Sequence, residues 1–467
     1  MTQQVRHILI RGAGYLAARQ ALGLLVSGAG TLLLARFIGP GNYGIFASAV
    51  ATCNMLARFT QLGLVPRLIS EVRELDRGTI GHAVAISISV SGAGMLVATI
   101  ATLAIDHWIP LRAFVPAFLA MVPGIMLLNL SIVATTLLER SLDYRRVAAV
   151  EMTFQLTQTF VAVAVGFLAP SFWAPVCGFW AALLLSFGLL VLYVRDVLRP
   201  VWNLQAMARL ASSSLPFAAN PWFAQLRDLV NPLVVGAAFG PSAVGIVALT
   251  LRLIMAIGAM REIVRRLALP GMRRLIGDEV QLRGFVESAR DAQIFLVGLP
   301  LLVFSFMLPL LEEWGIGRSW DGVTKVYPLL AIAYFIGVFS VLPVCALMIL
   351  QQRKLMVANS AAQLLTLVAV AVVLTPRFGI MGYGVAEIVA AFASLMAVAA
   401  ARRLIGPLSA ALPILTSAAV IAGCTWLYIG PVALIPLMLL PLSPRVRQFV
   451  AHSIAELRTL RNSSSTD

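Results

Sequence analysis

Residues 38–48 read IGPGNYGIFAS and residues 239–249 read FGPSAVGIVAL. An offset of 201 residues aligns Gly39 with Gly240, Pro40 with Pro241 and Gly44 with Gly245. A weaker similarity, at an offset of 204, pairs residues 176–179 with residues 380–383. Glycine-proline turns are common between helices, but two sequence similarities at nearly the same offset predict that the chain arose by duplication. The six aligned residues are the candidate hinge and turn positions.

Long apolar runs flank both turns. Residues 22–34 and 296–311 contain no charged residue, and the whole chain is 60% hydrophobic and only 12% charged. A helix needs about 20 apolar residues to cross a bilayer, whereas a β-barrel would show shorter segments of alternating polarity. The sequence therefore predicts an all-α polytopic membrane protein and excludes a soluble enzyme and a disordered chain.

Fourteen transmembrane helices are predicted. The spans are 14–38, 42–69, 80–105, 113–138, 146–169, 172–194, 211–239, 242–268, 290–311, 325–350, 355–375, 380–404, 409–428 and 430–443. The last span is short and contains three prolines, so the last two spans could together form one re-entrant hairpin. The prediction is therefore twelve transmembrane helices, or fourteen if both of the last two spans cross the bilayer.

The duplication organises these helices into domains. The prediction is an N-terminal six-helix lobe (residues 1–205), a C-terminal six-helix lobe (206–405), two extra helices (406–444) and an amphipathic cytoplasmic tail (445–467). Because six is even, both lobes enter the membrane with the same orientation, so the repeats are parallel. Two parallel bundles around a central cavity are the architecture of a transporter that works by alternating access.

The distribution of basic residues sets the orientation. With both termini in the cytoplasm, the inner segments hold 27 basic residues and the outer segments hold five, as the positive-inside rule requires. The net charge of +15 is thus spread over short loops beside the bilayer. The bilayer is the expected partner of these charges, and nucleic acid is not.

Three arginines remain inside predicted helices: Arg58, Arg227 and Arg252. A charge facing lipid at the bilayer centre costs at least about 2.5–3.5 kcal/mol, so these side chains should face protein or a wet cavity. A guanidinium forms bidentate hydrogen bonds to phosphate, so the three are candidate ligands for a pyrophosphate or an anionic glycan. An internal salt bridge, such as Asp228 with Arg252, is the structural alternative. Arg19 and Arg36, toward the ends of the first helix, are expected to snorkel.

Carboxylates at membrane depth are candidates for ion coupling. Asp228 and Glu387 could each bind a driving H⁺ or Na⁺, and Glu151 lies nearer the inner face. A structural hydrogen bond is the alternative role. No metal-ligand spacing surrounds the four cysteines, so neither a metal nor another cofactor is expected.

An enzyme is disfavoured. The four histidines lie near helix ends or tails, and no Walker-type phosphate loop is present. A glycan polymerase would be expected to use paired catalytic carboxylates on a large outer loop, and no large outer loop is predicted, since the longest is roughly 312–324. The sequence therefore predicts a transporter without a catalytic residue.

The stretch from Leu33 to Gly44, LLARFIGPGNYG, resembles the first hairpin of bacterial polysaccharide exporters of the Wzx type. The segments 226–229 and 378–382 resemble the seventh helix of that family and the entrance to its twelfth. These exporters belong to the multidrug/oligosaccharidyl-lipid/polysaccharide (MOP) flippase superfamily. The resemblance covers most of the chain, and the family shares topology more than residues.

The resemblance implies a MATE-like fold in the bacterial cytoplasmic (inner) membrane. It also implies translocation of a polyprenyl-pyrophosphate-linked oligosaccharide for cell-surface polysaccharide assembly, with a glycan polymerase and a ligase as candidate partners. Three alternatives stay open: a peptidoglycan-precursor flippase, a cation-coupled MATE-type drug exporter, and a membrane glycan polymerase or ligase. Cationic drugs would favour carboxylates over buried arginines, which argues against the exporter.

Overall fold

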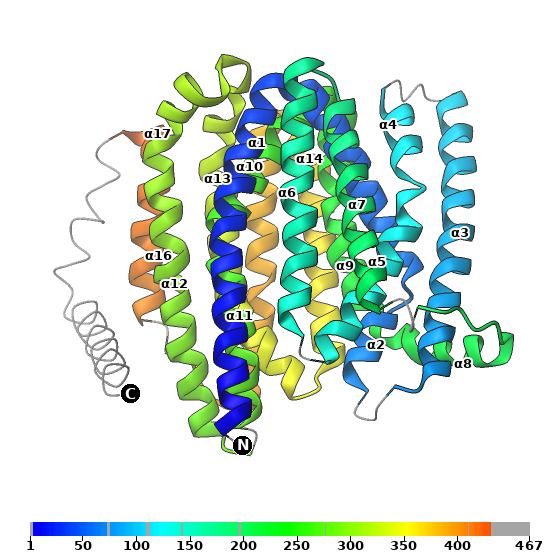
Figure 1. Cartoon of the computed structure of the whole chain (residues 1–467). Helices are drawn as coiled ribbons and strands as arrows, with labels where there is room; N and C mark the ends of the chain where they lie inside the picture. The colour runs from blue at the N-terminus through cyan, green and yellow to red at the C-terminus, as the bar shows by residue number, and fades with distance from the viewer. Residues whose placement is uncertain are drawn as a thin grey trace. The chain divides into compact units, whose positions relative to one another are not determined.

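The computed structural model describes residues 3–71, 75–108, 113–141, 143–194, 198–275, 277–409 and 411–430. Helices dominate this part of the chain, and no described residue lies in a β-strand (Figure 1). The all-α class is confirmed. The predicted span 430–443, apart from Gly430, and the predicted amphipathic tail lie outside the described residues.

The first half of the chain contains α1 (Gln3–Thr60), α2 (Leu64–Ser70), α3 (Arg77–Trp108), α4 (Phe114–Met121), α5 (Gly124–Arg140), α6 (Tyr144–Leu168) and α7 (Trp173–Val194). The second half begins with α8 (Leu204–Ser214), the 3₁₀-helix η1 (Leu215–Phe217), α9 (Ala219–Asp228), the π-helix η2 (Asn231–Val235), α10 (Gly236–Ile257) and α11 (Met260–Arg273). It continues with α12 (Glu279–Leu310), η3 (Leu311–Ile316), η4 (Arg318–Trp320), α13 (Gly322–Ile349), α14 (Arg353–Ala393), α15 (Leu395–Ile405), α16 (Ala411–Cys424) and α17 (Trp426–Ile429).

Three of these helices break at a glycine. The 58 residues of α1 would extend about 87 Å if straight, nearly three times the hydrocarbon thickness of a bilayer. The helix instead breaks at Gly39, with φ 73°, and Figure 1 shows it rising to the top of the view and returning. Gly240 and Gly379 break α10 and α14 with φ 77° and 66°. These breaks confirm the predicted divisions between three pairs of spans.

Seven helices among the described residues are long and apolar enough to cross a membrane. The number is eight if α4 and α5, which bend by 43° at Val122 and Pro123, form one span. The chain is therefore a multi-pass membrane protein. The figure of fourteen spans stays a prediction, since two of these seven helices each contain two predicted spans.

Two predicted spans correspond to more than one helix in the structure. The predicted span 242–268 is interrupted, because α10 ends at Ile257 and α11 begins at Met260. A Cβ atom at Gly258 would lie 2.3 Å from the ring of Tyr334, whose hydroxyl donates to the Gly258 carbonyl at 3.1 Å. The predicted span 211–239 is also interrupted, because the chain forms the separate helix α8 and the 3₁₀ turn η1 before α9 begins.

Side-chain caps fix where several helices begin. Asp143 accepts a hydrogen bond from the Arg146 amide at 3.2 Å at the start of α6, and Asn203 accepts one from Ala206 at 3.1 Å at the start of α8. Such caps satisfy amides that have no partner within the helix. At the start of α3, the Thr79 hydroxyl donates to Asp76 and holds the pKa of that carboxyl below its ordinary value.

The described residues fall into two compact units. The first comprises the described parts of 1–256, 311–323 and 360–386, and the second those of 257–310, 324–359 and 387–467. In the first unit, α6 and α7 pack along each other (Figure 1), and a buried core gathers around Phe118 and Ile125. In the second, the core gathers around Met272 and Leu342.

These units do not follow the boundary at residue 205, because segments of the second half of the chain pack with the first half in one unit. The division into two six-helix lobes stays a prediction. All three candidate arginines belong to the first unit, so their surroundings can be compared directly.

Candidate functional site

The two glycine-proline turns of the repeat meet in the first unit. A Cβ atom at Gly44 would lie 1.8 Å from the Pro241 carbonyl oxygen. Reciprocally, a Cβ atom at Gly245 would lie 2.1 Å from the Pro40 carbonyl oxygen. We call Pro40, Gly44, Pro241 and Gly245 the twin-turn contact. Backbone approaches backbone here more closely than any side chain allows, and the exchange of partners is what a two-fold axis between repeats produces.

Aromatic and polar groups surround the twin-turn contact. The indole of Trp320 donates to the Ala35 carbonyl at 3.2 Å, and its ring lies edge-on to Tyr43 with ring centroids 5.7 Å apart. Arg36 donates to the Trp314 and Gly315 carbonyls at 3.2 and 3.3 Å. Arg36 thus binds backbone carbonyls of η3. This is a specific contact, whereas the sequence predicted only that Arg36 would snorkel.

The twin-turn contact is a common starting point from which the positions of Arg252 and Arg58 along their helices can be compared. Arg252 lies twelve residues beyond Gly240 and Arg58 lies nineteen residues beyond Gly39, about 18 and 28 Å along their helices. Because the turns touch, the two arginines differ in depth by about 10 Å. They therefore occupy successive levels rather than one layer.

Arg252 lines a pocket of mixed polar and apolar side chains. Its guanidinium donates a hydrogen bond to the side chain of Tyr43, which is buried. The pocket is lined by Gly30, Thr31, Leu34, Tyr43, Phe46, Gln158, Thr159, Ala162, Pro175 and Arg252. Arg252 is the sole lining residue from the second repeat. The described structure thus brings one cation to a group of hydroxyl and amide side chains from the first.

Sequence reasoning identified Arg252 but missed its polar neighbours. Thr31, Gln158 and Thr159 carry no charge, so nothing in their composition separated them from other polar residues of apolar helices. Tyr43 lies inside the repeat motif, where the second copy has Val244, but most aligned positions differ between the two copies, so this difference gave no separate signal.

Arg227 lies at the end of α9, half-buried, and donates to the Gln363 side chain of α14 at 3.3 Å. A second side-chain bond joins the same helices, from Ser360 to Asn220 at 2.6 Å. The neighbouring Asp228 is exposed and accepts a hydrogen bond from Gln225 at 2.8 Å. Arg227 therefore already serves helix packing, and its role in binding stays a prediction.

Arg58 lies in the last turn of α1 and is exposed. Its guanidinium donates to the Gln61 side chain at 3.2 Å. Its backbone carbonyl accepts a hydrogen bond from the Trp222 indole at 3.1 Å, and the ring of Phe59 stacks on Trp222 at 4.8 Å. The chain around Arg58 is therefore held by α9 while the guanidinium stays accessible.

The candidate coupling carboxylates differ in exposure. Glu387 is only 5% exposed, Glu151 is half-buried and Asp228 is exposed. Ion coupling and a structural hydrogen bond both stay predictions for these carboxylates. Among the described residues, no three His, Cys, Asp or Glu side chains are placed to hold a metal ion.

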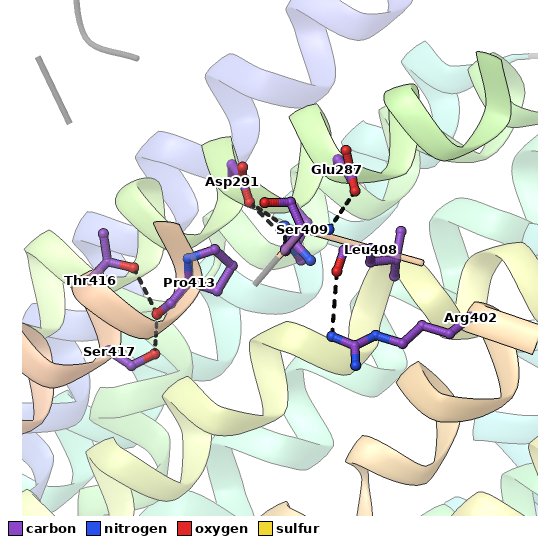
Figure 2. A network of polar contacts seen from close by, with 9 residues as sticks. Glu287, Asp291, Arg402, Leu408, Ser409, Pro413, Thr416 and Ser417 are labelled. Atoms are coloured by element: carbon purple, nitrogen blue, oxygen red, sulfur yellow. Dashed lines mark hydrogen bonds and ion pairs between the residues drawn. The ribbon is translucent and has the colours of Figure 1, made fainter. Parts of the chain in front are cut away.

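Arg290 is a buried cation at the first residue of the predicted span 290–311. It lies inside α12, is 3% exposed, and donates to Asp291 at 2.8 Å and to the Ser409 carbonyl at 2.7 Å. Figure 2 shows Asp291, Glu287 and Ser409 together, and Glu287 accepts from the Ser409 amide at 2.5 Å. These bonds hold the segment before α16 against α12, a structural role.

Asp291→Ala should destabilise the protein strongly. Removing one partner of a buried ion pair leaves an uncompensated charge, which costs about 3–5 kcal/mol. We expect a markedly lower apparent melting temperature in detergent and a smaller monodisperse fraction after heating. Arg402→Ala is the matched control, because its bond to the Leu408 carbonyl is long, at 3.5 Å. Equal melting temperatures for Asp291→Ala and wild type would contradict the structural role.

Comparison with known proteins assigns the chain to a family. The model of a family described as polysaccharide biosynthesis protein matches residues 33–325. Among curated proteins, none matches the sequence.

Solved structures match over most of the chain. The lipid II flippase MurJ in an inward closed conformation matches with a TM-score of 0.70, at 11% identity, over 96% of this chain and 99% of that one. An inward-facing MATE multidrug resistance transporter of the MOP superfamily gives 0.60, at 12% identity, over 85% and 94%. A MOP transporter from Pyrococcus furiosus, described as having a binding pocket of reverse polarity, gives 0.53, at 13% identity, over 87% and 95%. At these identities the matches show the fold, which is MurJ- and MATE-like.

Proposed function

We propose, because this chain belongs to the polysaccharide biosynthesis protein family, that it is a flippase for a polyprenyl-pyrophosphate-linked oligosaccharide. The cargo would move from the inner to the outer leaflet of the bacterial cytoplasmic membrane for surface polysaccharide assembly. The observation that carries the proposal is Arg252, a cation beside hydroxyl and amide groups in the described structure.

The chemistry of this pocket suits a phosphate-linked sugar. A guanidinium supplies paired, charge-assisted hydrogen bonds to phosphate oxygens. Hydroxyl and amide side chains such as Thr31 and Gln158 can both donate to and accept from sugar hydroxyls. An apolar prenyl tail needs no such site, since it can remain in lipid while the head group passes between helices.

Alternating access supplies the movement. Closing the twin-turn contact seals the predicted outer end, so the arginines would be reached from the cytoplasm. Opening that contact would carry Arg252, which follows Gly240 on α10, away from the Tyr43 pocket of the first repeat. The head group would then be released outward. Asp228 and Glu387 are the proposed coupling sites for H⁺ or Na⁺.

A peptidoglycan precursor is the second candidate cargo. The structural match to the lipid II flippase, with a TM-score of 0.70, favours it. Both cargoes carry a pyrophosphate, so the arginines serve either one. A cationic drug is less favoured, because the described pocket presents a guanidinium and no carboxylate.

Depletion of the protein in its host tests the function and identifies the cargo. We expect a polyprenyl-pyrophosphate-glycan to accumulate, and mass spectrometry of lipid extracts will give its sugar composition. A lipid-linked peptidoglycan precursor in place of a surface-polysaccharide unit would select the second cargo. Unchanged lipid pools together with increased sensitivity to cationic drugs would contradict both and support the MATE-type exporter.

A further inference from the structure

A buried polar network lies beneath Arg58. Its centre is Asn129 of α5, which is fully buried. The Asn129 amide donates to the Thr60 and Ser91 hydroxyls at 2.8 and 2.7 Å, and its oxygen accepts from the Gln61 amide at 3.0 Å. None of these four side chains is more than 5% exposed. Polar groups buried this deeply among apolar helices are costly unless each bond is made.

The direction of every bond in this network is determined. The single hydroxyl hydrogen of Thr60 goes to a backbone carbonyl of its own helix, that of Leu56 at 2.8 Å. The Thr60 oxygen can therefore only accept from Asn129, which turns the Asn129 oxygen toward Gln61. Gln61 must present its NH₂ group to Asn129, so its own oxygen faces Arg58.

The backbone at this point is equally constrained. Leu62 and Gly63, directly after Gln61, both have positive φ, 49° and 74°. A leucine in this region is unusual and needs support from its surroundings. A Cβ atom at Gly63 would lie 2.5 Å from the Ser214 carbonyl oxygen, so the break in the helix is tightly packed. The break ends α1 just beyond Arg58.

We infer that Gln61 is a positioning residue, which holds the Arg58 guanidinium by an acceptor oxygen of fixed direction. Asn129 sets that direction from the protein interior. One or two guanidinium N–H groups are held by Gln61, and the others remain free for an anionic ligand, since a guanidinium has five donors. The inference rests on the proposed function. It adds Gln61, which acts on the pyrophosphate only by positioning Arg58.

A double-mutant cycle of Arg58→Ala and Gln61→Leu tests the inference. The assay is the rate of transbilayer movement of a polyprenyl-pyrophosphate-linked oligosaccharide in proteoliposomes, measured against its concentration. We expect Gln61→Leu to raise the half-saturating concentration about tenfold, the size of one lost hydrogen bond to a charged group. In the Arg58→Ala background the same substitution should add almost nothing, because the partner is already gone.

A merely structural role predicts a different result. Gln61→Leu would then lower the melting temperature and the maximal rate by the same factor with or without Arg58, and additive losses of this kind overturn the inference. Thr52→Val is the matched control and should leave transport unchanged, since the Thr52 hydroxyl donates to the Ser48 carbonyl of its own helix. If wild type moves no lipid at all, the proposed function fails; if wild type moves it and the losses are additive, only the role of Gln61 fails.

Discussion

Arg252→Ala should abolish transport while leaving folding and membrane insertion intact. Arg252 is exposed in the described structure, so its removal opens no cavity in a core. It does remove the one guanidinium from the pocket that contains Tyr43. Loss of a bidentate, charge-assisted contact with a pyrophosphate should lower transport roughly a hundredfold or more. Transport is measured in proteoliposomes, and insertion by the yield of monodisperse protein.

Two further variants make this prediction specific. Arg252→Lys keeps the charge but loses the forked donor, so we expect partial transport. Arg377→Ala removes an exposed arginine from α14, away from the pocket, and should leave transport unchanged. Full activity of Arg252→Ala would remove this residue from the site, whereas equal losses in Arg377→Ala would show a general dependence on charge.

Gly44→Ala and Gly245→Ala should each prevent closure of the twin-turn contact. A methyl group at either position would meet a backbone carbonyl at 1.8 or 2.1 Å. A flexible side chain could move aside, but a carbonyl within a helix cannot without shifting the helix. We expect transport to fall at least tenfold. Gly28→Ala and Gly92→Ala are the controls, because a Cβ atom at either has no neighbour within 4 Å.

A disulfide reports the state of this contact directly. A Cβ atom at Gly41 would lie 3.4 Å from the Ser242 hydroxyl oxygen, so the pair Gly41→Cys and Ser242→Cys should be close enough to cross-link. The exposed Cys177 is first replaced by serine. Oxidation should stop transport and reduction should restore it, and Gly44→Ala should suppress cross-linking. Efficient cross-linking together with normal transport in Gly44→Ala would show that the contact is not a gate.

The helical class and the broken helices were predictable from sequence. Apolar runs must form helices in a bilayer, since an unpaired backbone there is too costly. A glycine before a proline can adopt the positive φ that ends one helix and begins the next, as Gly39 and Gly240 do. The repeat also predicted which turns correspond. It could not show that they touch, because that contact depends on tertiary packing.

Other features could not be predicted because they depend on partners distant in sequence. The break after Ile257 depends on Tyr334, which lies 76 residues beyond Gly258. The burial of Arg290 involves Ser409, which is 119 residues away. Similarly, Asn129 and Gln61 are ordinary polar residues until the fold brings α1 and α5 together.

The most direct measurement of the central claim uses proteoliposomes containing the purified protein and the lipid that accumulates on depletion. A glycan-modifying enzyme added outside reports how much of the lipid head group is accessible. The account predicts that wild-type protein makes head groups placed on the inner face accessible within the assay, and that Arg252→Ala does not. Equal accessibility in wild-type, Arg252→Ala and protein-free vesicles would contradict a flippase that acts through this arginine.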